Sequence, residues 1–197
     1  MLKRALIAAV LLATPYTAPY TAFAGPYEDG QAAYASGDYE KALKLYSEAA
    51  EGGNAEAQLL LGFLFFNGDG VAQNYNTSVK WFTKAARQGD ARSQAQLGIM
   101  YENGQGVPQD FGAAAQWFNR AADQGYSLAQ NSLGLMYAVG QGVKQDYARA
   151  HMWLNLAAAQ QYEGAQENRD EVAKRMTTDQ ITQAQGMARQ WIEKNSQ

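Results

Sequence analysis

Four acidic or amide residues recur at one spacing and are the first candidates for chemistry. They are Asp38, Asn74, Asp110 and Asp146, each 36 residues from the next. A series of carboxylates could supply general acids and bases. However, only Asp or Asn occupies this position, each precedes an apolar stretch with helical spacing, and both types are strong helix N-caps. We therefore predict that these residues cap helices rather than catalyse a reaction.

A nucleophilic enzyme needs a base beside its nucleophile, usually a histidine or the lysine of a Ser-x-x-Lys motif. The only histidine is His151, which lies inside a helical pattern and is expected to be structural. No Ser-x-x-Lys occurs, and the nearest match, Thr77-x-x-Lys80, lies at the solvent-facing start of a predicted helix. Carboxylates such as Asp69 and Glu102 can be paired on paper, but nothing in the sequence places two in one pocket. We predict no catalytic residue.

The composition also argues against a metal, a cofactor or a nucleic acid. Cysteine is absent, which excludes disulfides and thiolate ligands, and a single histidine argues against a multi-histidine metal site. The Gly-x-Gly pairs lack a following Gly-Lys-Ser/Thr and do not follow strands, so they do not predict a phosphate loop. A formal net charge of −3 disfavours nucleic acid and anionic lipid as partners. We expect none of these ligands.

The chain repeats itself with a period of 36 residues. Three copies cover 55–90, 91–126 and 127–162, and a shorter copy covers 27–54. The long copies share a Leu-Gly pair, an aromatic residue, a Gly-x-Gly loop, a valine, the capping residue, a tryptophan and a double alanine. In the middle copy these are Leu97, Gly98, Tyr101, Gly104, Gly106, Val107, Asp110, Trp117, Ala121 and Ala122. Self-similarity at this period indicates a solenoid of stacked units.

Each long copy is predicted to contain two helices joined by the glycine loop. In the middle copy, apolar residues at i, i+3 and i+4 place helix A at about 92–103 and helix B at about 111–124. Gly104 follows helix A, where a left-handed residue is wanted. Trp117 and Phe118 are expected to fill the core between neighbouring repeats.

The two ends depart from this pattern. The first copy has no Gly-x-Gly loop, and its helices are expected at about 27–36 and 39–51. After the last copy, Thr177-x-x-Gln180 matches a capping box that opens a helix over about 178–194. We expect residues 163–195 to form helices that close the exposed end of the solenoid.

Residues 1–24 are predicted to be a secretory signal peptide. Lys3-Arg4 forms a basic start, the apolar run 5–13 is far shorter than the roughly 20 residues of a membrane span, and Ala22-Phe23-Ala24 matches a cleavage site. An uncleaved signal anchor is the alternative. Cleavage after Ala24 would change the formal charge from −3 to −5, because it removes two basic residues and no acidic one. We therefore expect a periplasmic or secreted protein without membrane insertion.

The repeat resembles the Sel1-like repeat, a relative of the tetratricopeptide repeat. The resemblance is carried by Leu-Gly-x-x-Tyr-x-x-Gly-x-Gly-Val-x-x-Asp and Ala-x-x-Trp-Phe-x-x-Ala-Ala-x-x-Gly within residues 91–125. It implies an all-α fold, a right-handed α-solenoid of antiparallel helix pairs, in a single domain over 25–197. It also implies an adaptor or scaffold role, often in periplasmic or secreted bacterial proteins.

In such a superhelix, helix A of each repeat lines a concave surface that would bind the partner. Apolar members could hold a partner's side chain, and asparagines could bond to its backbone; alternatively, the apolar members pack between repeats and the polar ones are merely solvated. The predicted partner-binding residues are Glu56, Leu59, Phe63, Phe66, Asn67, Arg92, Ile99, Glu102, Asn103, Asn131 and Leu135, with Ala95, Leu128, Ala138 and Val139 beside them.

Three functions remain open at this point. The leading hypothesis is a non-enzymatic protein–protein interaction scaffold that binds a peptide or a protein surface. The alternative is a cell-wall-associated enzyme or receptor, either penicillin-binding, lactam-hydrolysing or glycan-binding, which rests on the family resemblance alone. The family members discussed in that role carry cysteine pairs, which this chain lacks. The third is a component of a larger assembly. The sequence leaves the partner's identity and the oligomeric state open.

Overall fold

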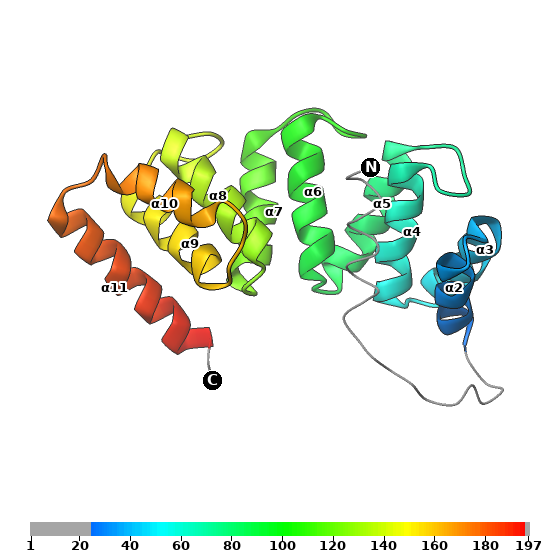
Figure 1. The fold of residues 1–197 in the computed structure, drawn as a ribbon. Helices are drawn as coiled ribbons and strands as arrows, with labels where there is room; N and C mark the ends of the chain where they lie inside the picture. The colour runs from blue at the N-terminus through cyan, green and yellow to red at the C-terminus, as the bar shows by residue number, and fades with distance from the viewer. Residues whose placement is uncertain (1–24, 196–197) are drawn as a thin grey trace. The chain divides into compact units, whose positions relative to one another are not determined.

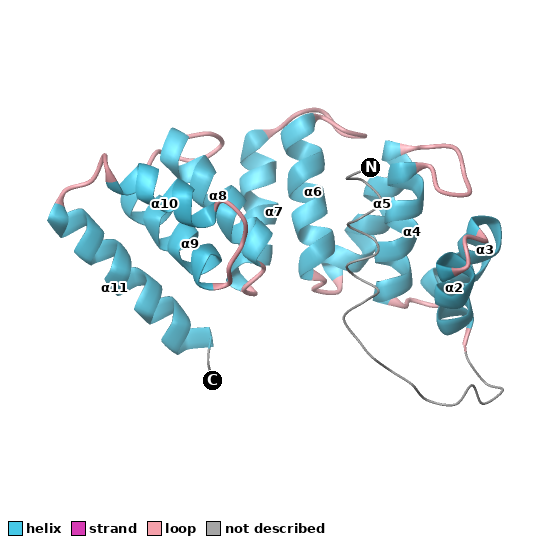
Figure 2. Ribbon diagram, in the orientation of Figure 1, coloured by secondary structure: helices cyan, strands magenta, loops and turns pink. Residues whose placement is uncertain are grey.

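The protein is helical between residues 25 and 195, the part of the chain that the computed structural model describes (Figures 1 and 2). This part contains α2 (Pro26–Ala35), α3 (Tyr39–Glu51), α4 (Ala55–Asn67), α5 (Tyr75–Arg87), α6 (Ala91–Asn103), α7 (Phe111–Asp123), α8 (Ser127–Val139), α9 (Tyr147–Ala159), α10 (Ala165–Ala173) and α11 (Thr178–Asn195), and no strand. None of these helices is long and apolar enough to cross a membrane. The predicted signal peptide lies outside the described residues.

The chain divides into two compact units after Gln88. The first unit contains α2 to α5, and the second contains α6 to α11. Within each unit, consecutive helices pack in pairs: α2 with α3 and α4 with α5 in the first, α6 with α7 and α8 with α9 in the second (Figure 1). The predicted helix A and helix B of every repeat are therefore present, with ends within one residue of those expected.

The recurring acidic and amide residues cap the second helix of each pair, as predicted. Asp38, Asn74, Asp110 and Asp146 accept a hydrogen bond from the backbone N–H three residues further on, at 3.1, 3.0, 2.9 and 3.0 Å. Each side chain thus satisfies one of the N–H groups that a helix start leaves without a partner. Their recurrence is explained by repeated helix starts.

The last helix, α11, also begins with the predicted cap. The backbone N–H of Thr177 donates to the Gln180 side chain at 2.9 Å, and the N–H of Gln180 donates to the Thr177 hydroxyl at 3.3 Å, which is a reciprocal capping box. The helix that follows, α11, packs mainly against α9. The Trp191 ring of α11 lies 6.1 Å from the Trp153 ring of α9, edge to face. The last helix therefore covers the outer side of the fourth repeat.

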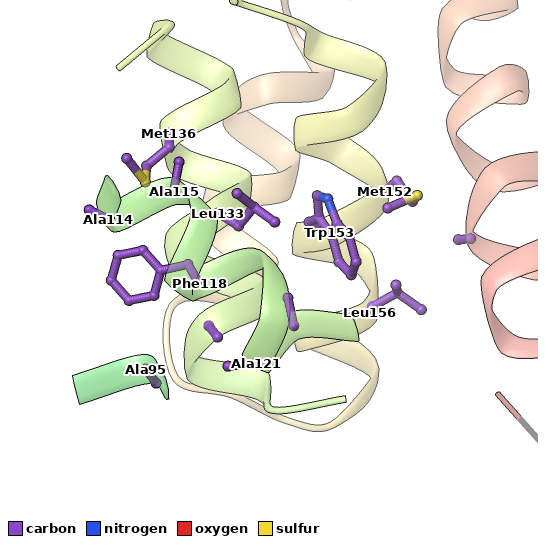
Figure 3. Packing of buried hydrophobic residues seen from close by; sticks show 13 residues of the cluster. Ala95, Ala114, Ala115, Phe118, Ala121, Leu133, Met136, Met152, Trp153 and Leu156 are labelled. Carbon is purple, nitrogen blue, oxygen red and sulfur yellow. The ribbon is translucent and has the colours of Figure 1, made fainter. Parts of the chain in front are cut away.

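Small residues let the two helices of a pair approach closely. A Cβ atom on Gly98 would lie 2.7 Å from the Phe118 ring, which is closer than real contacts allow. The same relation joins Gly62 to Phe82 and Gly134 to Leu154. In the second unit, Phe118 and the helix-B alanines form one core with Leu133 and Met136 of α8 (Figure 3). The glycine of the Leu-Gly pair is therefore a packing residue.

The prediction that Trp117 fills the core is wrong. Trp117 is half-buried, whereas Phe118 beside it is fully buried. The apolar stripe of α7 is centred on Phe118 and the double alanine, so Trp117 lies at its edge, with the Arg120 guanidinium 4.5 Å from the ring centroid. Trp153 differs because α11 covers it, and it is buried.

Candidate interaction surface

The Gly-x-Gly loop fixes the end of helix A and its distance from the neighbouring repeat. A Cβ atom on Gly142 would lie 2.1 Å from the carbonyl oxygen of Phe111, in the first turn of α7. In the first unit, a Cβ on Gly70 would lie 2.6 Å from the Cβ of Tyr39. Both glycines also have positive φ, +70° in each case. The loop backbone thus touches the preceding helix B, and the second glycine sets the spacing of the repeats.

A glutamine pair with one buried and one exposed member ties the two helices of each long repeat together, and sequence reasoning missed it. The side-chain amide of Gln88 donates to Gln58, that of Gln124 to Gln94, and that of Gln160 to Gln130, each at 2.8 Å. Gln58 and Gln130 also donate to the carbonyls of Ala50 and Ala122 in the preceding helix. The signal was available, because both glutamine columns recur every 36 residues.

A third glutamine column holds the C-terminal end of helix A. Gln73, Gln109 and Gln145 donate to the backbone carbonyls of Phe66, Glu102 and Ala138, at 2.7, 2.8 and 2.8 Å. Carbonyls in the last turn of a helix have no partner within the helix, so these bonds satisfy them. The end of each helix A, where several predicted binding residues lie, is therefore held in place.

In the first unit, two predicted binding residues are not on an open surface. Leu59 is fully buried, and Phe63 is 5% exposed with its ring 5.0 Å from that of Phe82. Their apolar side chains are part of the packing, which is the alternative raised for the apolar members. The Phe66 ring lies 5.2 Å from that of Tyr75 and is half-buried.

The polar residues predicted beside them are partly accessible. Glu56 and Asn67 are half-buried. The Asn67 amide donates to the Asp69 carboxylate at 3.2 Å, so one of its hydrogen-bonding groups is already used inside the chain. The first unit therefore offers less of the predicted binding surface than expected.

In the second unit, Asn131 is also unavailable, because α10 covers it. Asn131 is 9% exposed, and its side-chain oxygen accepts a hydrogen bond from Asn168 of α10 at 3.1 Å. Arg92 folds back on the helix cap, with its guanidinium 2.7 Å from the Asp90 carboxylate and 30% of its side chain exposed. The sequence could not show the contact of Asn131 with Asn168, since α10 does not follow the repeat pattern.

The remaining predicted residues form what we call the helix-A face: Ile99, Glu102 and Asn103 of α6, and Leu135 and Val139 of α8. Ile99 is half-buried, whereas its equivalent Leu135 is 39% exposed and Val139 is 65% exposed. Asn103 is exposed, and partial burial raises the pKa of Glu102. The face thus joins open apolar side chains to an amide and a carboxyl group.

His151 belongs to the core of the fourth repeat. Its side chain is 5% exposed, and its Nδ1 atom has no hydrogen-bond partner among the described residues. Burial lowers the pKa of His151, and the nearby Arg169 lowers it further, while Asp170 acts in the opposite direction. Within residues 25–195 no group of three or more histidine, aspartate and glutamate side chains is arranged to hold a metal ion. The predicted structural role of this histidine agrees with its burial.

Four segments of the chain match the Sel1 repeat: residues 22–54, 55–90, 91–126 and 127–162. The chain belongs to the Sel1 repeat family. The matched segments from residue 55 onward coincide with the three 36-residue copies, and the first includes the shorter copy. The recognition of the repeat is therefore confirmed, as is its all-α fold of helix pairs.

Solved structures of other Sel1 repeat proteins resemble this one. A Sel1 repeat protein from Oxalobacter formigenes is 32% identical with a TM-score of 0.65, over 68% of this chain and 55% of that one. Helicobacter pylori cysteine rich protein B is 26% identical with a TM-score of 0.52, over 65% of this chain and 92% of that one. A protective antigen of uropathogenic Escherichia coli is 34% identical with a TM-score of 0.49, over 79% of this chain and 41% of that one. No curated protein matches the chain.

These comparisons set the general class of function. Sel1 repeat proteins are generally scaffolds for protein interactions and are not typically enzymes. The chain spans about half the length of the Oxalobacter protein and less of the Escherichia protein. Unlike the cysteine-rich Helicobacter protein, it contains no cysteine.

Proposed function

We propose that this Sel1 repeat protein is a non-enzymatic scaffold that binds a peptide or a surface of another protein on its helix-A face, in the periplasm or outside the cell. The observation that carries the proposal is the exposure of Leu135 and Val139 on a helix whose end is held rigidly. Exposed apolar side chains beside polar ones are typical of an interaction site.

The arrangement of the face supports an extended partner. Leu135 and Val139 are at i and i+4, so both lie on one side of α8 and can hold one apolar side chain. Asn103 carries both a donor and an acceptor, which suits a partner's backbone. Because Gln109 and Gln145 hold the ends of α6 and α8, little conformational entropy is lost from the scaffold on binding.

A capture experiment tests this proposal. The tagged protein is incubated with an extract of the cell envelope and the medium of its source, and the bound proteins are identified. We expect Leu135→Glu to abolish capture of a specific partner, because a charge replaces an apolar contact. The matched control is Ile192→Glu, at an apolar residue of α11 that is 47% exposed. Capture that survives Leu135→Glu, or is lost equally with both variants, would exclude this face.

The location is tested separately. Fractionation of the source cells should find the protein in the periplasm or the medium, with Gly25 as its first residue. Nothing in the described residues favours the cell-wall enzyme over the scaffold. Incubation with a fluorescent penicillin checks its covalent form, and we expect no labelled protein.

A further inference from the structure

The fourth repeat shows how the outer side of a helix B receives another helix. Met152, Trp153 and Leu156 lie on the side of α9 toward α11 and are 7%, 5% and 4% exposed (Figure 3). The contact on α11 is made by Met187 and Trp191, in the same core cluster. An amphipathic helix with a tryptophan in its C-terminal part therefore docks on this face.

The equivalent face of the second repeat also has a tryptophan, but the residues on either side of it are different. Two periods earlier, the positions of Met152, Trp153 and Leu156 are held by Lys80, Trp81 and Lys84 of α5. Trp81 is half-buried, with the Lys84 ammonium 3.8 Å from its ring centroid. A hollow of about 550 Å³ runs along this side of α5. The aromatic anchor is present, and both flanking apolar positions are cationic.

The charge on this face has one sign. Lys80, Lys84 and Arg87 are exposed at i, i+4 and i+7, so they form a stripe along α5, and Tyr75–Arg87 contains no acidic residue. None of the three is in an ion pair with another described residue. The chain as a whole is acidic, with a formal charge of −3, so this local excess of positive charge is not a property of the composition.

We propose that the basic α5 face, formed by Thr77, Lys80, Trp81, Lys84 and Arg87, docks an acidic amphipathic helix of a partner protein. The way in which α11 packs on Trp153 indicates a helix that offers an apolar side chain to Trp81. The lysines in place of methionine and leucine require carboxylates at the flanks of that helix, because opposite charges make the contact favourable and specific. This surface belongs to helix B and is separate from the helix-A face.

The helix in the described residues that docks on such a face is α11, and beside Trp191 it carries Arg189, Glu193 and Lys194, with a net positive charge. Its two cations would lie near the lysines of α5 and repel them, so α11 of a second copy is not the occupant that we propose. The proposed occupant is a different protein with acidic residues at those positions.

Fluorescence anisotropy with two labelled peptides tests this inference on the full chain. The probe is the peptide of residues 178–195 with R189E, Q190E and K194E, and the reference is the unchanged 178–195 peptide. We expect the probe to bind with a Kd of about 10–100 μM and the reference at least about ten-fold more weakly. Raising the salt concentration should weaken binding of the probe, because the charges are exposed.

Two double variants with the same change in charge test where the probe binds. Lys80→Glu with Lys84→Glu should weaken binding of the probe by about ten-fold or more, whereas Lys41→Glu with Lys44→Glu on α3 should leave it within about two-fold. Circular dichroism checks that both variants keep their helices. Absence of saturable binding at about 1 mM probe, or an equal loss in both variants, would overturn the proposal. So would binding to phosphatidylserine vesicles, lost in the α5 variant, without binding of the peptide.

Discussion

The glutamine pairs, each with one buried member, join the two helices of each long repeat by a side-chain hydrogen bond. Gln130 is fully buried, accepts a hydrogen bond from Gln160 and donates to the carbonyl of Ala122. A buried amide without these bonds would be destabilising, so the pair is favourable only when both members are present.

Replacing one member of the pair tests this account. We expect Gln130→Leu to lower the free energy of unfolding by about 1–3 kcal/mol, because it removes the hydrogen bonds that the buried Gln130 makes with Gln160 and with the Ala122 carbonyl. Urea unfolding of both single variants and the double variant, Gln130→Leu with Gln160→Leu, measures the coupling. Additive effects of the two substitutions would show that the hydrogen bond contributes little.

The packing of α7 gives a second test at this scale. Phe118→Ala should cost about 3–5 kcal/mol, the range for a buried aromatic residue, whereas Trp117→Ala should cost clearly less, about 1–2 kcal/mol, because its ring is already half in water. Chemical denaturation of the two variants measures the difference. Equal losses would mean that Trp117 is more buried in solution than the structure has it.

His151 should make stability depend on pH. Because its folded pKa lies below the ordinary value of 6.5, the unfolded chain takes up a proton more readily than the folded one. Its contribution to stability is therefore fully present above pH 6.5 and is lost as the pH falls below that value toward the folded pKa. We expect a decline of at most about 1.4 kcal/mol per pH unit in this window, since one proton is involved.

The variant His151→Leu isolates this contribution. Other groups, such as Glu102 and Asp123, whose pKa values are raised by burial, titrate in both proteins and cancel in the difference. Arg169 and Asp170 of α10 act on the histidine and remain in the variant. The difference between the two unfolding free energies should therefore change between pH 7 and pH 5. A constant difference would show that the histidine titrates normally.

The sequence predicted the role of a residue where that role depends on near neighbours in the chain, and missed it where it depends on distant ones. The capping role of Asp110 follows from the residue type and the helix start beside it. The glutamine pairs join residues 30 positions apart, and the sequence signal was a recurrence that only the hairpin geometry explains. Trp117 was misplaced because Trp and Phe are both apolar, and the pattern does not say which of two adjacent residues points inward.

At the scale of elements, the glycine loop decides how closely repeats stack. We expect Gly142→Ala to destabilise the protein by more than about 2 kcal/mol, since its Cβ would overlap the Phe111 carbonyl in addition to the strain at φ +70°. Gly164→Ala is the matched control, because Gly164 has φ +76° and nothing closer than 4.0 Å to an added Cβ. Thermal and urea unfolding compare the two. A similar loss of stability in both variants would show that backbone strain, and not the overlap with Phe111, causes the effect.

The helices themselves were predictable, and what covers them was not. Periodicity and caps placed the helix ends, because these depend on neighbours within about four residues. The burial of Asn131 by Asn168 and of Trp153 by Trp191 depends on the last two helices, which carry no copy of the repeat. The predicted partner-binding surface is smaller than expected where such contacts, or the packing of Leu59 and Phe63, bury its members.

At the scale of the whole molecule, the last helix is attached by few buried residues. Only Ala184 and Ala188 of α11 are buried, so its attachment depends largely on the contact of Trp191 with Trp153. Trp191→Ala should lower stability by about 2 kcal/mol, less than for a fully buried tryptophan, and should speed hydrogen exchange throughout α11. Ile192→Ala, at the exposed neighbour, should change neither by a measurable amount. Unchanged exchange in the first variant would contradict this.

The self-contained glutamine pair bears on how such a chain can change its length over evolution. Each pair lies inside one 36-residue copy, and its further bond is to a main-chain carbonyl, which any preceding helix supplies whatever its sequence. Duplicating or losing one whole copy would therefore leave no buried amide without a hydrogen-bond partner. We therefore expect related chains to differ by whole 36-residue copies more often than by insertions of other sizes between the two glutamines.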